Sequence, residues 1–145
     1  MSSVLFICRG NVARSQFAEM FLKKLRPDLK VASYGTSVFD SQGVSKDGQE
    51  LAYLYGRDAP VIVCMKEEGI DMEHNTRKQL TEDILKSYDD VIVMAEPYSF
   101  PEYFKKYSNL EFWTIDDPKG ENLDFHRRVR DEVKSEVEKK YLKRV

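Results

Sequence analysis

Four short apolar runs along the chain predict β-strands. The first, residues 4–7, is rich in β-branched and aromatic residues, which is typical of a strand buried on both faces. The others are residues 30–36, 90–94 and 111–115. Each run is followed by a segment of different periodicity, so the strands are separated along the chain rather than joined by tight hairpins.

Helices are predicted between and after these runs, because apolar residues recur there at helical spacing. The first of them is stopped by Pro27. The predicted helices cover residues 17–25, 59–68, 97–107 and 122–142. Strands that alternate with helices in this way predict an α/β sandwich around a parallel sheet.

The polar face of the last predicted helix is rich in arginine and lysine, with acidic residues between them. Mixed charges at helical spacing are typical of a solvated face. We therefore assign Arg127, Arg128 and Arg130 to solvent rather than to a nucleic-acid site. His126 lies on the same face, and the sequence suggests no partner for it.

Composition narrows the class of protein. The chain has 145 residues, 41% of them hydrophobic, so we expect one domain over residues 1–145 with its own core. The net charge of −2 gives no general attraction to nucleic acid or to an anionic membrane. No run reaches transmembrane length, no signal peptide is evident, and two distant cysteines make no disulfide framework. We expect a cytoplasmic protein that binds neither nucleic acid nor membranes.

The segment after the first strand combines residues that suit anion binding. Gly10 and Asn11, which adopt positive φ most easily, lie between a strand and a helix N-terminus. Such a loop directs backbone N–H groups and the helix dipole towards an anion. Cys8 in this setting is favoured as a thiolate, and the Arg14 fork fits two oxygens of a tetrahedral oxyanion. Ser15 can donate its hydroxyl to the thiolate.

The run Cys-Arg-Gly-Asn-Val-Ala-Arg-Ser resembles the phosphate-binding loop of the low-molecular-weight protein tyrosine phosphatases. Their superfamily also contains the thioredoxin-coupled arsenate reductases. The resemblance implies a three-layer sandwich with a four-stranded parallel sheet in the order 2-1-3-4, and a site at the carboxyl ends of the strands. It also implies phosphate binding by Arg9, Gly10, Asn11, Val12, Ala13, Arg14 and Ser15.

The resemblance extends beyond the loop and implies further roles. Asp117 lies directly before a proline, where the family has the general acid that protonates the leaving oxygen. Together with Cys8 and Arg14 it would form the catalytic set. In the family, the serine that matches Ser33 supports the loop from below, and the histidine that matches His74 hydrogen-bonds the loop asparagine. We expect no cofactor and no metal.

Two residues are assigned to the substrate rim by the same resemblance. Phe39 falls where the phosphatases have an aromatic wall, and Lys119 stands where many of them have a tyrosine. Residues 40–58 form a longer connection than is usual in the family. This connection is expected to form a loop and a short helix, either as a cover on one side of the site or as inert surface.

The sequence leaves more than one activity open. Gln16 and Trp113 favour the reductases, but Met94 stands at the end of the third strand where those enzymes have a cysteine. Cys64 lies in an apolar helical segment, and Ala13 replaces a loop cysteine found in many phosphatases. We expect a phosphatase acting on a phosphorylated protein, with phosphotyrosine as first choice, or on a small phosphomonoester, with inorganic phosphate or a similar oxyanion binding in the loop. The alternatives are an arsenate reductase that uses an external thiol and a non-catalytic oxyanion-binding regulatory module.

Overall fold

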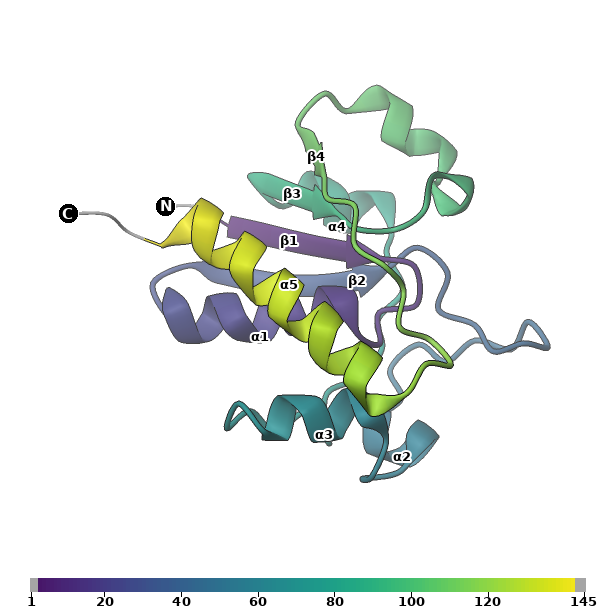
Figure 1. Cartoon of the computed structure of the whole chain (residues 1–145). Helices are drawn as coiled ribbons and strands as arrows, with labels where there is room; N and C mark the ends of the chain where they lie inside the picture. Colours follow the sequence, from purple (N-terminus) through teal and green to yellow (C-terminus); the bar gives the residue numbers. More distant parts are fainter. Residues whose placement is uncertain (1–2, 143–145) are drawn as a thin grey trace.

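The computed structural model describes residues 3–142 and has a parallel four-stranded sheet at its centre (Figure 1). Strand β1 (Ser3–Cys8) pairs with β2 (Lys30–Gly35) on one side and with β3 (Asp90–Val93) on the other. Strand β4 (Leu110–Phe112) pairs with β3 at the edge. The order β2-β1-β3-β4 confirms the predicted sheet, and the carboxyl ends of all four strands meet at one edge.

Two long helices flank this sheet. Helix α1 (Arg14–Leu25) connects β1 to β2, and α5 (Leu123–Tyr141) follows β4. None of the helices within residues 3–142 combines the length and apolar character that a membrane span requires. The shorter helices are α2 (Leu51–Tyr55), α3 (Pro60–Lys66) and α4 (Glu82–Lys86), together with the 3₁₀ helices η1 (Pro97–Ser99) and η2 (Glu102–Lys106).

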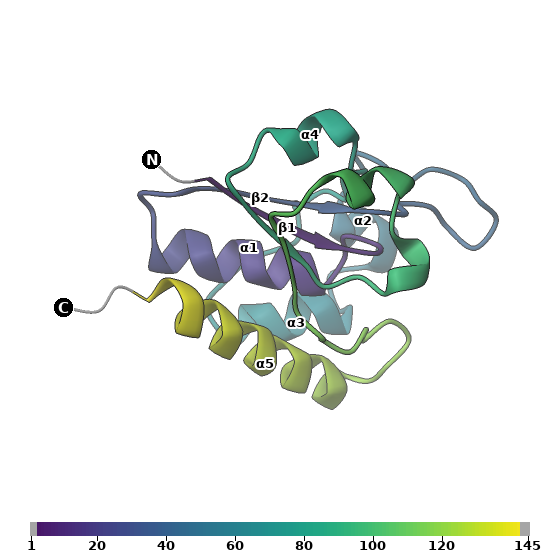
Figure 2. The ribbon, with the colours of Figure 1, turned by 90° about the horizontal axis from the view of Figure 1, so that it is seen from above.

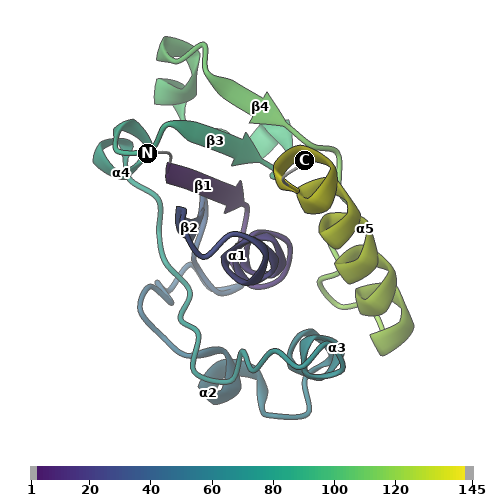
Figure 3. The same ribbon diagram turned by 90° about the vertical axis from the view of Figure 1, so that its left-hand side faces the viewer.

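Alternate residues of β1 face two different layers of the core. Val4 and Phe6 pack with residues of α1, α3 and α5, whereas Leu5 and Ile7 pack with residues of α4 and η2. Figures 2 and 3 show α1 and α5 on one side of the sheet and α4 on the other. Because both faces of β1 are buried, the strand is a continuous apolar run. The result is the expected three-layer sandwich.

The aromatic helix predicted over residues 97–107 is wrong in form. The segment instead makes the short helices η1 and η2, which Pro101 separates. Proline has no N–H to donate and its ring obstructs the preceding turn, so one continuous helix cannot pass through this position. The aromatic rings pack as expected, with Phe100 and Phe104 at a centroid distance of 5.2 Å.

Helix α5 differs from the prediction at two polar residues, which are buried rather than solvated. Arg130 Nη1 donates to the Cys64 carbonyl and to Glu67 Oε1, each at 2.8 Å, at the C-terminal end of α3. The last carbonyls of a helix have no partner within it, so this guanidinium caps α3. His126 Nδ1 lies 2.9 Å from the Asn122 carbonyl oxygen. The prediction fails because α5 packs on α3 over a wider face than its apolar stripe.

We expect the Glu67 carboxylate to make stability depend on pH. Hydrogen bonds from Arg127, and then from Arg130, lower the pKa of Glu67 from 4.5 to about 2. A carboxyl whose pKa is lowered by folding stabilises the fold above its unfolded pKa, and this contribution is lost as the pH falls through the folded value. Glu67→Gln should therefore be less stable than the unchanged protein near neutral pH. The difference should vanish as the pH falls from about 4.5 to about 2.

Urea unfolding of both proteins across this pH range measures the difference in free energy of unfolding. Glu102→Gln is the matched control, since the Glu102 side chain is exposed and its ion pair is with Lys105, three residues later on the surface. A Glu67→Gln difference that stays constant down to about pH 2 would contradict the assignment.

Candidate active site

A tight loop at the carboxyl edge of the sheet connects β1 to α1. Cys8 is the last residue of β1 and Arg14 is the first residue of α1, so a strand end and a helix start fix these two side chains. The loop lies close against Gly35 at the end of β2. A Cβ at Gly35 would lie 2.8 Å from the Arg9 carbonyl oxygen and 2.9 Å from the Asn11 nitrogen. Only glycine permits this approach without displacing the loop.

Asn11 forms the structural centre of the loop. It adopts a left-handed conformation with φ of 54°, which is rare for a residue with a side chain. Its Nδ2 donates to Ser15 Oγ at 2.8 Å and to Ser33 Oγ at 3.0 Å, and its Oδ1 accepts from the Lys78 backbone N–H at 2.8 Å. A backbone N–H can only donate, so Lys78 fixes the orientation of the amide. These three bonds hold the strained backbone in place.

The Cys8 sulfur is buried and lies between two hydrogen-bond donors. Ser15 Oγ is 3.0 Å from Sγ, and the Asn11 backbone nitrogen donates to Sγ at 3.3 Å. Since Ser15 Oγ accepts from Asn11, the hydroxyl proton of Ser15 is free to point at the sulfur. Two donors directed at one sulfur stabilise a thiolate, which is the nucleophilic form of cysteine.

The polar network continues below the loop to Glu19. The Ser33 hydroxyl, which accepts from Asn11, donates to Glu19 Oε1 at 2.6 Å, and Lys23 pairs with the other oxygen of Glu19. Within residues 3–142, no buried side-chain nitrogen or oxygen lacks a hydrogen-bond partner. A fully satisfied buried network of this kind rigidifies the loop above it.

The role predicted for His74 is wrong. Its side chain is 72% exposed, and its Nδ1 lies 3.1 Å from Glu50 Oε1 rather than against the loop. The hydrogen bond with Glu50 raises the pKa of His74. The Asn11 side-chain oxygen accepts from other groups, among them the Lys78 N–H. The Lys78 N–H reaches Asn11 because the Lys78 carbonyl accepts from the Gly35 N–H at 2.8 Å, and this bond places the segment after His74 alongside β2.

Arg14 is 2% exposed, and its guanidinium is bound by residues that follow β3 and β4. Its Nη1 donates to the carbonyls of Met94 at 2.6 Å and Ile115 at 3.1 Å. The Glu96 carboxylate accepts from both terminal nitrogens, with Oε2 at 2.8 Å from Nη1 and Oε1 at 3.1 Å from Nη2. Within the described residues Nε of Arg14 donates to no acceptor and is not fully buried, so this edge of the guanidinium is available to an oxyanion.

Neighbouring negative charges keep the Arg14 guanidinium protonated by raising its pKa. Burial by itself lowers the pKa of the guanidinium, but the negative charges of Cys8 and Glu96 outweigh burial and raise it. Sequence reasoning missed Glu96. The available signal was a carboxylate placed just after a buried strand, at the edge where the ends of parallel strands meet.

Asp117 and Asp116 are adjacent in sequence but face different partners. Asp117 Oδ2 lies 3.5 Å from Arg14 Nη2, and its Oδ1 accepts from the Lys119 backbone N–H at 3.1 Å. Asp116 Oδ2 lies 3.4 Å from Arg128 Nη2 on α5. Of these two aspartates, Asp117 is therefore the one whose carboxylate lies beside Arg14.

Both residues predicted for the substrate rim are exposed, and the structure adds a further aromatic residue beside the loop. Phe39 is partly exposed two residues after Ser37, whose N–H donates to the Arg9 carbonyl at 2.8 Å, and Lys119 is exposed in the turn after the fourth strand. A further aromatic residue, Tyr98, is exposed with its ring centroid 5.5 Å from the Arg9 guanidinium carbon. Arg9 and Tyr98 lie far apart in the sequence, and only the packing of the segment after β3 against the loop brings them together.

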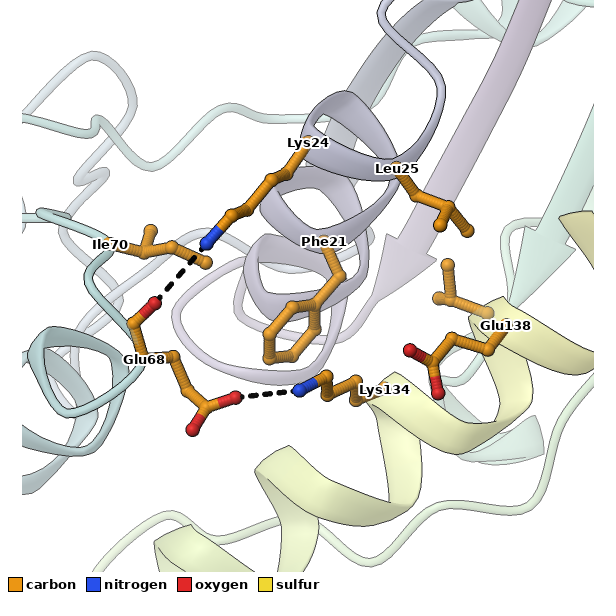
Figure 4. A pocket seen from close by; sticks show the side chains of 8 residues that line it. Phe21, Lys24, Leu25, Glu68, Ile70, Lys134 and Glu138 are labelled. Carbon is orange, nitrogen blue, oxygen red and sulfur yellow. Dashed lines mark hydrogen bonds and ion pairs between the residues drawn. The ribbon is translucent and has the colours of Figure 1, made fainter. Parts of the chain in front are cut away.

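The cavities formed by the described residues include two outside the loop. The one in Figure 4, of about 230 Å³, lies between α1, α5 and the segment after α3, and a Glu68–Lys134 pair at 2.9 Å spans it. No predicted site residue lines it. The other, of about 340 Å³, lies between the ends of β3 and β4, and its lining includes Met94, Glu96 and Ile115, the three residues that hold Arg14. This second cavity therefore adjoins the candidate active site.

A parallel α/β fold with a buried cysteine, a fixed guanidinium and an adjacent carboxylate around one loop defines a class of cysteine-based oxyanion-binding proteins. Residues 3–145 match the family model described as low molecular weight phosphotyrosine protein phosphatase. The chain belongs to this family.

Similar proteins include both phosphatases and reductases. The protein named arsenate reductase 1 of Staphylococcus epidermidis is 33% identical over 137 residues, which cover 94% of this chain and 92% of that one. The structure of Vibrio vulnificus Wzb in complex with benzylphosphonate has a TM-score of 0.79 at 23% identity, covers 99% of each chain and shows the shared fold. An arsenate reductase in the phosphate binding state has a TM-score of 0.73 at 30% identity, covering 96% of this chain and 95% of that one. Similarity alone therefore leaves both activities open.

Proposed function

We propose that this protein is a metal-independent phosphatase that hydrolyses phosphomonoesters, with protein phosphotyrosine as the first substrate class, through a cysteinyl-phosphate. The observation that supports this most strongly is the convergence of Cys8, Arg14 and Asp117 on one loop. A binding module needs the guanidinium but has no use for a nucleophile or an acid. Vibrio vulnificus Wzb in complex with benzylphosphonate and the arsenate reductase in the phosphate binding state are similar structures, and both ligands are oxyanions of the expected kind.

Substrate binding would use the loop backbone together with Arg14. Within residues 3–142, the backbone N–H groups of Gly10, Val12 and Ala13 donate to no other group of the chain. These N–H groups and the open edge of the guanidinium would donate hydrogen bonds to the oxygens of a phosphate group. Because both are fixed before substrate arrives, they cost little reorganisation when charge develops in the transition state.

The chemistry would proceed in two steps. The Cys8 thiolate attacks phosphorus, the bond to the leaving oxygen breaks, and that oxygen takes a proton from Asp117. Water then attacks the cysteinyl-phosphate while the Asp117 carboxylate accepts a proton from it. The sulfur leaves as a thiolate, which the hydrogen bond from Ser15 stabilises.

The reductase alternative shares the first step but requires a second thiol. The chain contains one other cysteine, Cys64, which is buried within α3. Burial raises the pKa of this thiol to about 12, so it is not a nucleophile near neutral pH. Met94, a buried residue without a thiol, directly follows β3. An internal disulfide relay is therefore not supported, although an external thiol could supply the second step.

We expect arsenate to inhibit this protein competitively without being reduced by thioredoxin. Arsenate matches phosphate in shape and charge, so the loop and Arg14 should bind it, but no second thiol in the chain can release arsenite. Turnover of p-nitrophenyl phosphate with increasing arsenate measures the inhibition and separates an enzyme from a binding module. NADPH consumption, first with thioredoxin and its reductase and then with small thiols and a glutaredoxin-like partner, measures reduction.

Two outcomes would revise the proposal. Sustained reduction with thioredoxin would show that the argument from Met94 and Cys64 is wrong. Reduction only with small thiols, in the absence of turnover of p-nitrophenyl phosphate, would place the protein in the reductase class.

A further inference from the structure

Arg77 is a buried cation beside the loop. It is 5% exposed, its Nε donates to the Gly10 carbonyl at 2.9 Å, and its Nη1 donates to the Tyr55 hydroxyl at 3.1 Å. Neither partner is charged, and within residues 3–142 Arg77 forms no ion pair with a carboxylate. A buried charge without a countercharge is costly, so its place against the loop requires an explanation.

The carbonyl that receives Arg77 belongs to a peptide group that also contacts the nucleophile. Gly10 C=O and Asn11 N–H are the two polar groups of one trans peptide, and they point in opposite directions. Arg77 binds the oxygen, and the N–H donates to Cys8 Sγ at 3.3 Å. One rigid peptide therefore lies between the guanidinium and the sulfur.

This arrangement couples the Arg77 guanidinium electrostatically to a negative charge on the Cys8 sulfur. A charged donor on the carbonyl withdraws electron density from the peptide and strengthens the N–H as a donor, because linked hydrogen bonds polarise one another. It also prevents the peptide from turning its N–H away from the sulfur. A thiolate at Cys8, or an oxyanion bound beside it, is the countercharge that Arg77 otherwise lacks.

The long connection between β2 and α3 holds Arg77 in this position. The Arg77 N–H donates to the Gln49 carbonyl at 3.0 Å, and the Gly48 N–H donates to the Arg77 carbonyl at 2.7 Å. Tyr55, from α2, binds the other end of the side chain. Residues 40–58 thus support the loop indirectly, through Arg77.

We propose that Arg77 is a positioning residue that stabilises the Cys8 thiolate through the Gly10–Asn11 peptide. The inference rests on the proposed function in taking Cys8 as the nucleophile. A merely structural role would have a different signature. If Arg77 only tied the loop down, its removal would expose the buried sulfur and speed its alkylation at every pH, whereas loss of polarisation lowers the thiolate population.

The test is the rate of Cys8 alkylation by iodoacetamide across a range of pH, in the full chain. Arg77→Met removes the charge and the hydrogen bond but keeps much of the side-chain volume. We expect the rate near neutral pH to fall about tenfold, because a nearby charge shifts a thiol equilibrium by about this factor or more. The rate at the alkaline plateau, where the reacting thiol is ionised in both proteins, should not change. Arg77→Lys keeps the charge and should restore most of the neutral-pH rate.

Arg57→Met is the matched control. Arg57 is 77% exposed and pairs with Glu73 at 3.1 Å, so its alkylation profile should equal that of the unchanged protein. Circular dichroism and the melting temperature establish that each variant is folded. If Arg77→Met does not fold, Arg77→Gln, which keeps a neutral donor for the Gly10 carbonyl, is measured in its place and should also react several-fold more slowly near neutral pH.

An unchanged or faster rate near neutral pH in the folded neutral variant would overturn the proposal. So would an equal loss in Arg77→Lys, since shape rather than charge would then be responsible. Alkylation requires no phosphate substrate, so this result does not depend on whether the protein proves to be a phosphatase.

Discussion

Cys8→Ser is expected to lower turnover of p-nitrophenyl phosphate about 10⁴-fold or more while leaving oxyanion binding intact. The serine hydroxyl would occupy the place of the sulfur but would not ionise near neutral pH, so no covalent phosphoryl intermediate would form. The groups proposed to bind the oxyanion, Arg14 and the loop amides, are unaffected by the change. Initial rates measure turnover, and isothermal titration with inorganic phosphate measures binding.

The control for this prediction is Cys64→Ala, which removes the other thiol from the core of α3 and should leave turnover unchanged. Addition of EDTA to the unchanged protein should also have no effect, since the proposed reaction uses no metal. Full activity in Cys8→Ser, or loss of activity with EDTA, would exclude the mechanism.

Asp117→Asn is expected to slow substrates with poor leaving groups by about 10²- to 10⁴-fold, and activated substrates far less. An asparagine cannot give the leaving oxygen a proton, and only a poor leaving group needs one. The comparison is turnover of phenyl phosphate with turnover of p-nitrophenyl phosphate in the same variant. The ratio of the two rates isolates proton donation from any change in binding.

Asp116→Asn provides the matched control, one residue away. The Asp116 carboxylate faces Arg128 on α5 rather than Arg14, so its removal should lower both rates little and equally. If Asp116→Asn produced the leaving-group dependence and Asp117→Asn did not, the assignment of the acid would be wrong by one residue.

Patterns in the sequence by themselves predicted the strands and the loop between β1 and α1, whereas the order of the sheet followed from the family resemblance. Apolar runs mark β1 and β3 because these strands are buried on both faces, and the segment from Cys8 to Ser15 contains its strand end, turn residues and helix start in one short stretch. Local features of this kind depend on neighbours in the chain, so a pattern of neighbours can reveal them. The helix predicted over residues 97–107 is wrong because Pro101 interrupts it, and this effect of proline is also a local one.

Only the tertiary structure decided which side chains support the loop. Glu96 binds Arg14 across 82 positions of sequence, and Lys78 rather than His74 reaches Asn11 across 67. Arg77 contacts Gly10 across the same separation of 67. These contacts arise because parallel strands bring distant segments to one edge of the sheet, and spacing along the chain contains no record of that packing. The sequence thus determined the loop that contains Cys8, whereas the fold determined the charges placed around it.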